Sequence, residues 1–94
     1  MFSNENYLPF ATFNDSSIFF KATEVFRYGF LLEDILIEND FIQLYSYHNY
    51  YVEIMYGENY DEIRSIEAIT VGEALIKYID LEHFNEAFLD LFAA

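Results

Sequence analysis

The spacing of apolar residues predicts a helix near the N-terminus, over residues 16–30. The positions that recur on one helical face are Ile18, Ala22, Val25, Phe26 and Gly29. Three more aromatic residues lie partly off this face, so we expect the helix to be covered on more than one side: Phe19, Phe20 and Phe30. Residues 1–14 should form a lead-in segment, and a helix start is favoured by the polar side chains of Asn14, Asp15 and Ser16.

The middle of the chain has the composition of an antiparallel meander, over residues 41–69. Runs rich in aromatic and β-branched residues, separated by turn residues, span 41–47, 50–56 and 62–69. A two-residue turn predicts that Tyr47 pairs with Tyr50 and that Tyr45 pairs with Val52. A four-residue turn after the second run predicts that Ile54 pairs with Ile63 and Glu53 with Arg64. Residues 35–37 fit either a fourth strand or the tail of the preceding helix.

The end of the chain predicts two further helices, over residues 71–92. Thr70 and Glu73 have the spacing of a capping box, in which each side chain satisfies the other residue's backbone N–H. Asp80 begins a second helix, whose apolar face is Leu81, Phe84, Phe88, Leu91 and Phe92. The order predicts a single α+β domain over residues 1–94. It would consist of an N-terminal helix, a meander of three or four strands, and two C-terminal helices packed on one face of the sheet.

Charge adds that this domain must display an acidic surface. Four Lys and Arg residues stand against 17 Asp and Glu residues, which gives a net charge of −13 in a chain that is 54% hydrophobic. That apolar content excludes a disordered acidic tail, because such tails have too little to bury. Each base has an acidic neighbour: Glu24 for Lys21 and Arg27, Glu73 for Lys77, and Glu53 for Arg64. We therefore expect no basic patch that could bind nucleic acid directly.

Several kinds of chemistry lack the residues they need. The chain has no cysteine, and its two histidines, His48 and His83, fall in different predicted elements. Asp80, His83 and Glu86 have the three-residue spacing of metal ligands on a helix, but no second helix carries matching ligands. No serine lies in a nucleophile motif. We expect no metal, no cofactor and no catalytic residue. The chain shows no leader peptide and no run long enough to cross a membrane, so we also expect a cytoplasmic protein without a membrane partner.

Two acidic groups are candidates for a binding surface. The first repeats every four residues along one face of the last helix: Glu82, Glu86 and Asp90. Like charges at this spacing oppose helix formation, so the fold does not require them. The second group has four acids within eight residues and no base among them: Glu33, Asp34, Glu38 and Asp40. Taken singly, either group is better explained as a solubilising surface, and the charge imbalance of the whole chain shifts the interpretation toward an interaction surface.

The tyrosines of the meander are the other candidate contact residues. Six tyrosines lie in the meander: Tyr45, Tyr47, Tyr50, Tyr51, Tyr56 and Tyr60. Alternation along strands sends them to both faces of a sheet whose helices we expect on one face, so some should be exposed. The candidates for a protein contact are Tyr45, Tyr47, Tyr50 and Tyr51. Tyrosine is enriched in protein interfaces. The alternative is that cross-strand aromatic pairs stabilise the sheet.

These observations favour a non-catalytic domain that docks an acidic surface onto a basic surface of another protein, such as a nuclease or another protein that handles nucleic acid. Immunity proteins against nuclease toxins, nucleic-acid mimics and anti-CRISPR proteins have comparable charge and size, although no motif is shared with them. Two alternatives stay open. One is a module that self-associates as a homodimer through its tyrosine-rich sheet face, and the other is a small carboxylate enzyme or ligand binder.

Overall fold

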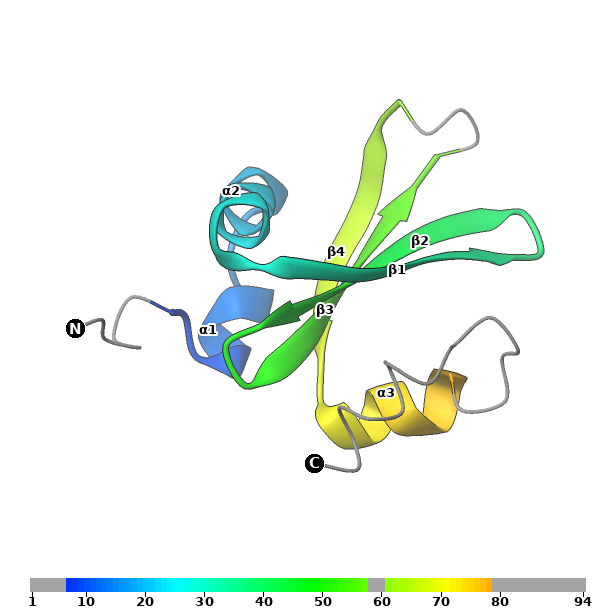
Figure 1. The fold of residues 1–94 in the computed structure, drawn as a ribbon. Helices are drawn as coiled ribbons and strands as arrows, with labels where there is room; N and C mark the ends of the chain where they lie inside the picture. Colours follow the sequence, from blue (N-terminus) through cyan, green and yellow to red (C-terminus); the bar gives the residue numbers. More distant parts are fainter. Residues whose placement is uncertain (1–6, 58–60, 79–94) are drawn as a thin grey trace.

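In the computed structural model, residues 7–57 and 61–78 are described, and they form a four-stranded antiparallel sheet with three helices (Figure 1). The helices are α1 (Phe10–Asn14), α2 (Ile18–Tyr28) and α3 (Val71–Tyr78). The strands are β1 (Phe30–Ile37), β2 (Asp40–Tyr47), β3 (Tyr50–Tyr56) and β4 (Ile63–Ile69). They lie in the order β1-β2-β3-β4, so the sheet is a simple meander. The predicted α+β class is confirmed.

The N-terminal part of the chain differs from the prediction in two ways. Part of the expected lead-in segment forms α1, a helix of five residues that begins after Pro9. Five residues are too few to show a helical period in sequence, which is why the pattern did not reveal it. The main helix is shorter than expected and is followed by a full strand, so β1 is the fourth strand and 35–37 belong to it.

Helix α2 passes into β1 through a single residue, Gly29. A Cβ atom at Gly29 would lie 2.6 Å from the backbone oxygen of Val25 and 3.3 Å from that of Ser46. Any larger residue would therefore clash with the last turn of the helix, and the backbone there would have to shift. At the other end of α2, the Ser17 hydroxyl accepts a hydrogen bond from the backbone N–H of Phe20 at 3.1 Å, and this bond caps the helix.

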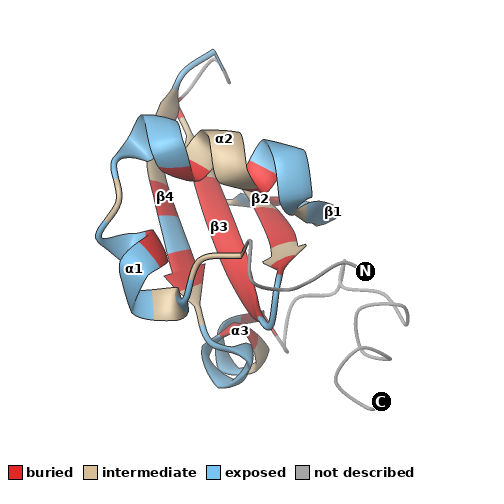
Figure 2. Ribbon diagram, turned by 90° about the vertical axis from the view of Figure 1, so that its left-hand side faces the viewer, coloured by how far each residue is buried: buried red, intermediate tan, exposed pale blue. Residues whose placement is uncertain are grey.

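Helices cover both faces of the sheet, whereas the sequence pattern suggested one. Phe13 and Val25, from α1 and α2, join one buried cluster with residues of β2, β3 and β4. Ala74 and Tyr78, from α3, join a second cluster on the opposite face with Ile35 and other strand residues. Strand β3 is consequently buried along most of its length (Figure 2). The predicted last helix, residues 80–92, lies outside the described residues.

The strand register was predicted correctly for one hairpin and wrongly for the next. Strands β2 and β3 pair as expected, with Tyr47 opposite Tyr50. Between β3 and β4 the structure pairs Ile54 with Ile66 and Glu53 with Glu67, in place of Ile63 and Arg64. The connection is longer than four residues: the Gly57 N–H donates to the Glu62 carbonyl at 2.9 Å, and a bulge follows Met55.

Candidate protein-binding surface

All four cationic side chains make a contact within the chain, although only Lys21 is buried. Lys21 is buried, and its Nζ donates to the backbone oxygen of Ile66 at 2.6 Å. Arg27 lies over the ring of Tyr28, with 5.9 Å between its Cζ and the ring centroid. The other two form ion pairs, Arg64 with Asp40 at 3.7 Å and Lys77 with Glu53 at 2.9 Å. The molecule therefore uses its few positive charges on its own backbone, ring and carboxylates.

None of these contacts is the acid–base pairing expected from sequence. Glu24 lies near Lys21 and Arg27 in sequence, but its carboxylate accepts a hydrogen bond from the Tyr47 hydroxyl at 2.6 Å. Glu73 accepts from the backbone N–H of Thr70 at 2.8 Å, which confirms the predicted capping box and occupies the expected partner of Lys77. Glu24 and Glu73 accept hydrogen bonds from a core tyrosine and from a helix-capping residue, so the bases contact other groups instead.

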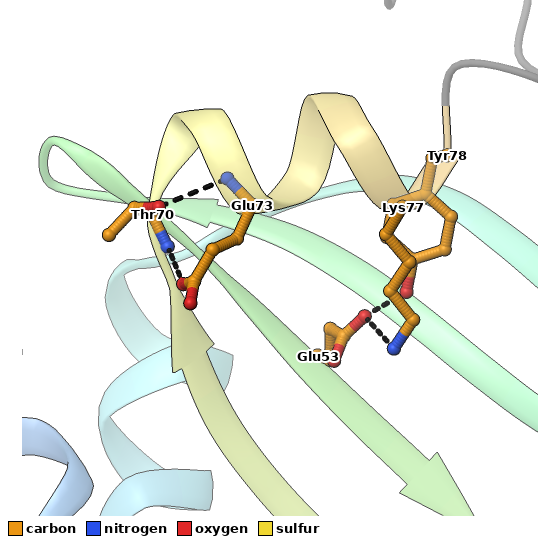
Figure 3. A network of polar contacts seen from close by, with 5 residues as sticks. All are labelled: Glu53, Thr70, Glu73, Lys77 and Tyr78. Atoms are coloured by element: carbon orange, nitrogen blue, oxygen red, sulfur yellow. Dashed lines mark hydrogen bonds and ion pairs between the residues drawn. The ribbon is translucent and has the colours of Figure 1, made fainter.

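A buried carboxylate attaches α3 to the sheet. Glu53 of β3 accepts a hydrogen bond from the hydroxyl of Tyr78 and pairs with Lys77, so two adjacent residues of α3 converge on one side chain (Figure 3). Burial, together with the hydrogen bond and negative charge of Glu53, raises the pKa of Tyr78 well above its ordinary value. This group is already satisfied from within the chain, so its position indicates a structural role.

The four candidate acids of β1 and β2 are spread around one hairpin. Glu33 and Asp34 are adjacent in β1, so their side chains point to opposite faces of the sheet. Glu38 is exposed in the turn, and Asp40 is held by Arg64. Asp34 accepts a hydrogen bond from the Gln43 amide at 3.2 Å and is otherwise exposed.

The fold adds two acids that sequence reasoning did not single out. Asp61 and Glu62 are exposed in the connection between β3 and β4. In an antiparallel meander this connection and the β1–β2 turn lie at the same end of the sheet, and the Arg64–Asp40 ion pair joins them. We call Glu38, Asp40, Asp61 and Glu62 the acidic end of the sheet. The predicted meander already implied this proximity, because every second turn of a meander lies at the same end of the sheet.

The candidate tyrosines do not form an exposed surface, which corrects the expectation from sequence. At most 8% of the surface of each is exposed: Tyr45, Tyr47, Tyr50 and Tyr51. They are buried because helices cover both faces of the sheet. Tyr47 and Tyr50 form the cross-strand aromatic pair of the alternative interpretation, with 5.5 Å between ring centroids. Burial and the charge of Glu24 raise the pKa of Tyr50 to about 12.

The exposed aromatic residues lie elsewhere, on α2 and the start of β1. Phe19 is 82% exposed and Phe30 is 69% exposed, so the expectation that these off-face residues are covered was wrong for the described structure. Leu36, near the end of β1, is 60% exposed. Isolated exposed apolar residues are common in proteins, but these lie along one helix and one edge strand.

The two edges of the sheet are treated differently. At the β4 edge the side-chain amide of Asn14 donates to the Ala68 carbonyl at 3.1 Å and accepts from the Ala68 N–H at 2.8 Å, much as a neighbouring strand would. Lys21 adds its bond to Ile66 on the same edge. Among the described residues, no hydrogen bond of this kind reaches the outer backbone groups of β1.

The described residues give no support to a metal centre, because no three potential metal ligands gather among them. His48 is an exposed turn residue whose ring stacks on Tyr7, with 5.0 Å between centroids. The helix-face candidates Glu82, Glu86 and Asp90 lie outside the described residues, as do Asp80 and His83. None of the described helices combines the length and apolar content needed to span a bilayer.

Comparisons with protein-family models, curated proteins and solved structures gave no match.

Proposed function

We propose that this chain is a non-catalytic, protein-binding domain that docks its acidic end onto a basic surface of a partner protein, one that handles nucleic acid, and inhibits the partner by occupying that surface. The observation that supports this most directly is the use of charge. All four cations are engaged internally, while Glu38, Asp61 and Glu62 have no ion pair within the described part of the chain.

The energetic consequence is a net negative potential at this end of the sheet, where Arg64 pairs with Asp40 and the other three acids have no ion pair among the described residues. Such a potential accelerates encounter with a positively charged surface and selects against acidic partners. Final affinity must then come from groups that become buried in the complex. Exposed apolar side chains near the acids, such as Leu36, can supply that contact. The row Glu82, Glu86 and Asp90 and a cytoplasmic location remain parts of this proposal that rest on sequence.

The test is capture of partners from a lysate at moderate salt, using the full chain and two charge-matched variants. Asp61→Lys with Glu62→Lys reverses two acids at the acidic end. Asp15→Lys with Glu67→Lys makes the same change in charge and residue type at exposed positions away from it. We expect a basic protein to be retained by the parent and the second variant, and its affinity to fall about tenfold or more with the first. Capture of no basic protein, or equal binding by both variants, would contradict the proposal.

Self-association is the competing function, and the exposed aromatic side chains of α2 favour it. Salt separates the two possibilities. Screening should strengthen a homodimer of a chain with a net charge of −13, and it should weaken a complex between this chain and a basic protein. Light scattering of the purified chain at low and high salt measures the first effect directly.

A further inference from the structure

We propose that the outer edge of β1, over residues 33–37, binds an extended basic segment of the partner as an added fifth strand. This inference rests on the proposed function, because the basic partner supplies the segment. The binding mode consists of backbone hydrogen bonds along the edge and two side-chain contacts. Asp34 contacts a cationic side chain of the segment, and Leu36 contacts an apolar one. Addition of a strand to an exposed sheet edge is a general way in which proteins bind extended peptides.

The first argument is the contrast between the two edges. Unpaired strand edges tend to recruit other strands, and proteins normally block them. The β4 edge is blocked by Asn14, which bonds both polar backbone groups of Ala68, and by Lys21, which bonds Ile66. The molecule therefore has side chains dedicated to closing one edge and, among the described residues, none that closes the other.

The register shows which backbone groups β1 offers. Ile37 and Asp40 close a two-residue turn, so they exchange hydrogen bonds across the hairpin. Because hydrogen-bonded pairs alternate along an antiparallel ladder, Ile35 and Ile42 are again hydrogen-bonded. The N–H and C=O groups of the two remaining residues, Asp34 and Leu36, point away from β2. Four outward groups at this spacing are what an added strand would bond.

The side chains of the same two residues give the edge its selectivity. Asp34 and Leu36 are two residues apart, so both side chains lie on one face of the sheet, and both are exposed. A strand added alongside would place its own residues opposite them on that face. The matching segment carries Lys or Arg opposite Asp34 and a large apolar residue opposite Leu36, two positions apart. The bulge between Leu31 and Glu33 ends the regular edge and limits the docked length.

Charge decides between a second copy of this chain and a basic partner. Two β1 strands that pair antiparallel through these outward groups would place Asp34 of each copy opposite Leu36 of the other, so the two Asp34 carboxylates would be diagonal neighbours on one face and would repel each other. This chain has no spare cation to offset them, because all four are engaged. A segment rich in Lys or Arg gains from the same carboxylates.

Amide hydrogen exchange of the full chain tests the binding mode directly. The probe is an octapeptide with threonine at every second position and lysine and valine alternating between, and the control peptide has glutamate in place of lysine. We expect the lysine peptide to slow exchange at the N–H groups of Asp34 and Leu36 by about tenfold or more, and the glutamate peptide to leave them unchanged. Protection that appears at β4 instead, or at no strand, would overturn the inference. So would protection of these two amides in the free chain through a homodimer.

Two substitutions at one position separate the backbone contribution from the side-chain contribution. Leu36→Pro removes the outward N–H and keeps every bond between β1 and β2, since that N–H is not part of the hairpin ladder. Leu36→Ala removes the same side chain and keeps the N–H. We expect Leu36→Pro to abolish peptide binding and Leu36→Ala to weaken it severalfold. Equal effects of the two would refute edge pairing, and the exchange measurement on the parent chain decides the question if the proline variant does not fold.

The same variants distinguish this inference from the proposed function. If a captured basic protein depends on Asp61 and Glu62 but binds Leu36→Pro normally, the acidic surface functions and the added strand is wrong. If the lysine peptide protects Asp34 and Leu36 while no basic protein is captured, the edge mode stands and the proposed inhibitor is wrong.

Discussion

Glu38 adopts a backbone conformation that favours glycine. It is the first residue of the β1–β2 turn, with a φ of 56°, and His48 occupies the equivalent position of the next turn with a φ of 58°. A side chain in this region normally costs free energy, and glycine is the preferred residue where the first turn residue has positive φ. An acid is thus held at the tip of the hairpin against the conformational preference of its backbone.

Replacing Glu38 with glycine should therefore stabilise the fold. We expect the free energy of unfolding to rise by about 1 kcal/mol, because the positive φ costs glycine little. Chemical denaturation measures the change. Asn39→Gly, at the neighbouring turn residue without positive φ, is the control and should give no gain. A loss of stability in Glu38→Gly would show that the carboxylate contributes to the fold.

Replacement of Glu53 should instead destabilise the fold, because its side chain is buried and bonded to Tyr78 and Lys77. Glu53→Ala should lower the free energy of unfolding by about 2 kcal/mol, because it removes the acceptor of a buried hydroxyl. Glu67 lies directly opposite on β4 but is exposed, so Glu67→Ala should change stability little. Urea titration of both variants checks the difference, and equal losses would contradict a structural role for the buried carboxylate.

At the scale of elements, helix α3 starts with a reciprocal cap. The Thr70 hydroxyl accepts a hydrogen bond from the Glu73 N–H at 3.0 Å, and the Glu73 carboxylate accepts one from the Thr70 N–H. Thr70→Ala should cost about 1 kcal/mol of unfolding free energy. Thr23→Ala makes the same chemical change inside α2, where the hydroxyl only bonds back to the Phe19 carbonyl, and it should be nearly neutral. Similar losses for the two variants would argue against the cap.

The elements also show which structural signals sequence carries. The capping box and the β2–β3 register were predictable because each depends on a few neighbouring residues and one short turn. The β3–β4 register was not, because a bulge and a longer connection shifted the pairing. The edge cap by Asn14 depends on a contact 54 residues away along the chain, so local patterns could not reveal it.

The candidate site followed the same division. Composition predicted the excess of acidic residues but not which of them lie close together. Asp61 and Glu62 lie at the same end of the sheet as Glu38 because the strands form a meander. The tyrosines were misjudged because period-two alternation says which face a side chain occupies and nothing about what covers that face. Coverage of both faces depends on where the flanking helices pack, which is a property of the whole fold.

At the scale of the whole molecule, a net charge of −13 should make stability depend on ionic strength. Repulsion among acids destabilises the compact state, and salt screens it. We expect the free energy of unfolding to rise by about 1 kcal/mol between low and moderate salt. Sodium chloride and potassium chloride at equal ionic strength should act alike. A fall in stability with salt would mean that the few ion pairs outweigh the general repulsion.

Buried tyrosines predict a second global dependence, on alkaline pH. The pKa of Tyr50 is raised from 10.0 to about 12 by burial and by Glu24. Its contribution to stability is fully present below about pH 10 and is lost between about pH 10 and 12, because the unfolded chain releases its proton first. The loss is about 1.4 kcal/mol per pH unit for each such tyrosine.

Unfolding measured at several alkaline pH values tests this dependence. Tyr50→Phe should make the decline shallower, whereas Tyr28→Phe, at an exposed position, should leave it unchanged. An identical decline in the parent and Tyr50→Phe would contradict the assignment.

The passage of α2 into β1 at Gly29 has a mechanical consequence. Only one residue separates helix and strand, and its N–H is hydrogen-bonded to the Val25 carbonyl at 2.7 Å, so we expect a displacement of the start of the strand to shift the end of the helix. A ligand bound at the edge of β1 would then change the amide signals of α2, even though it makes no contact with the helix.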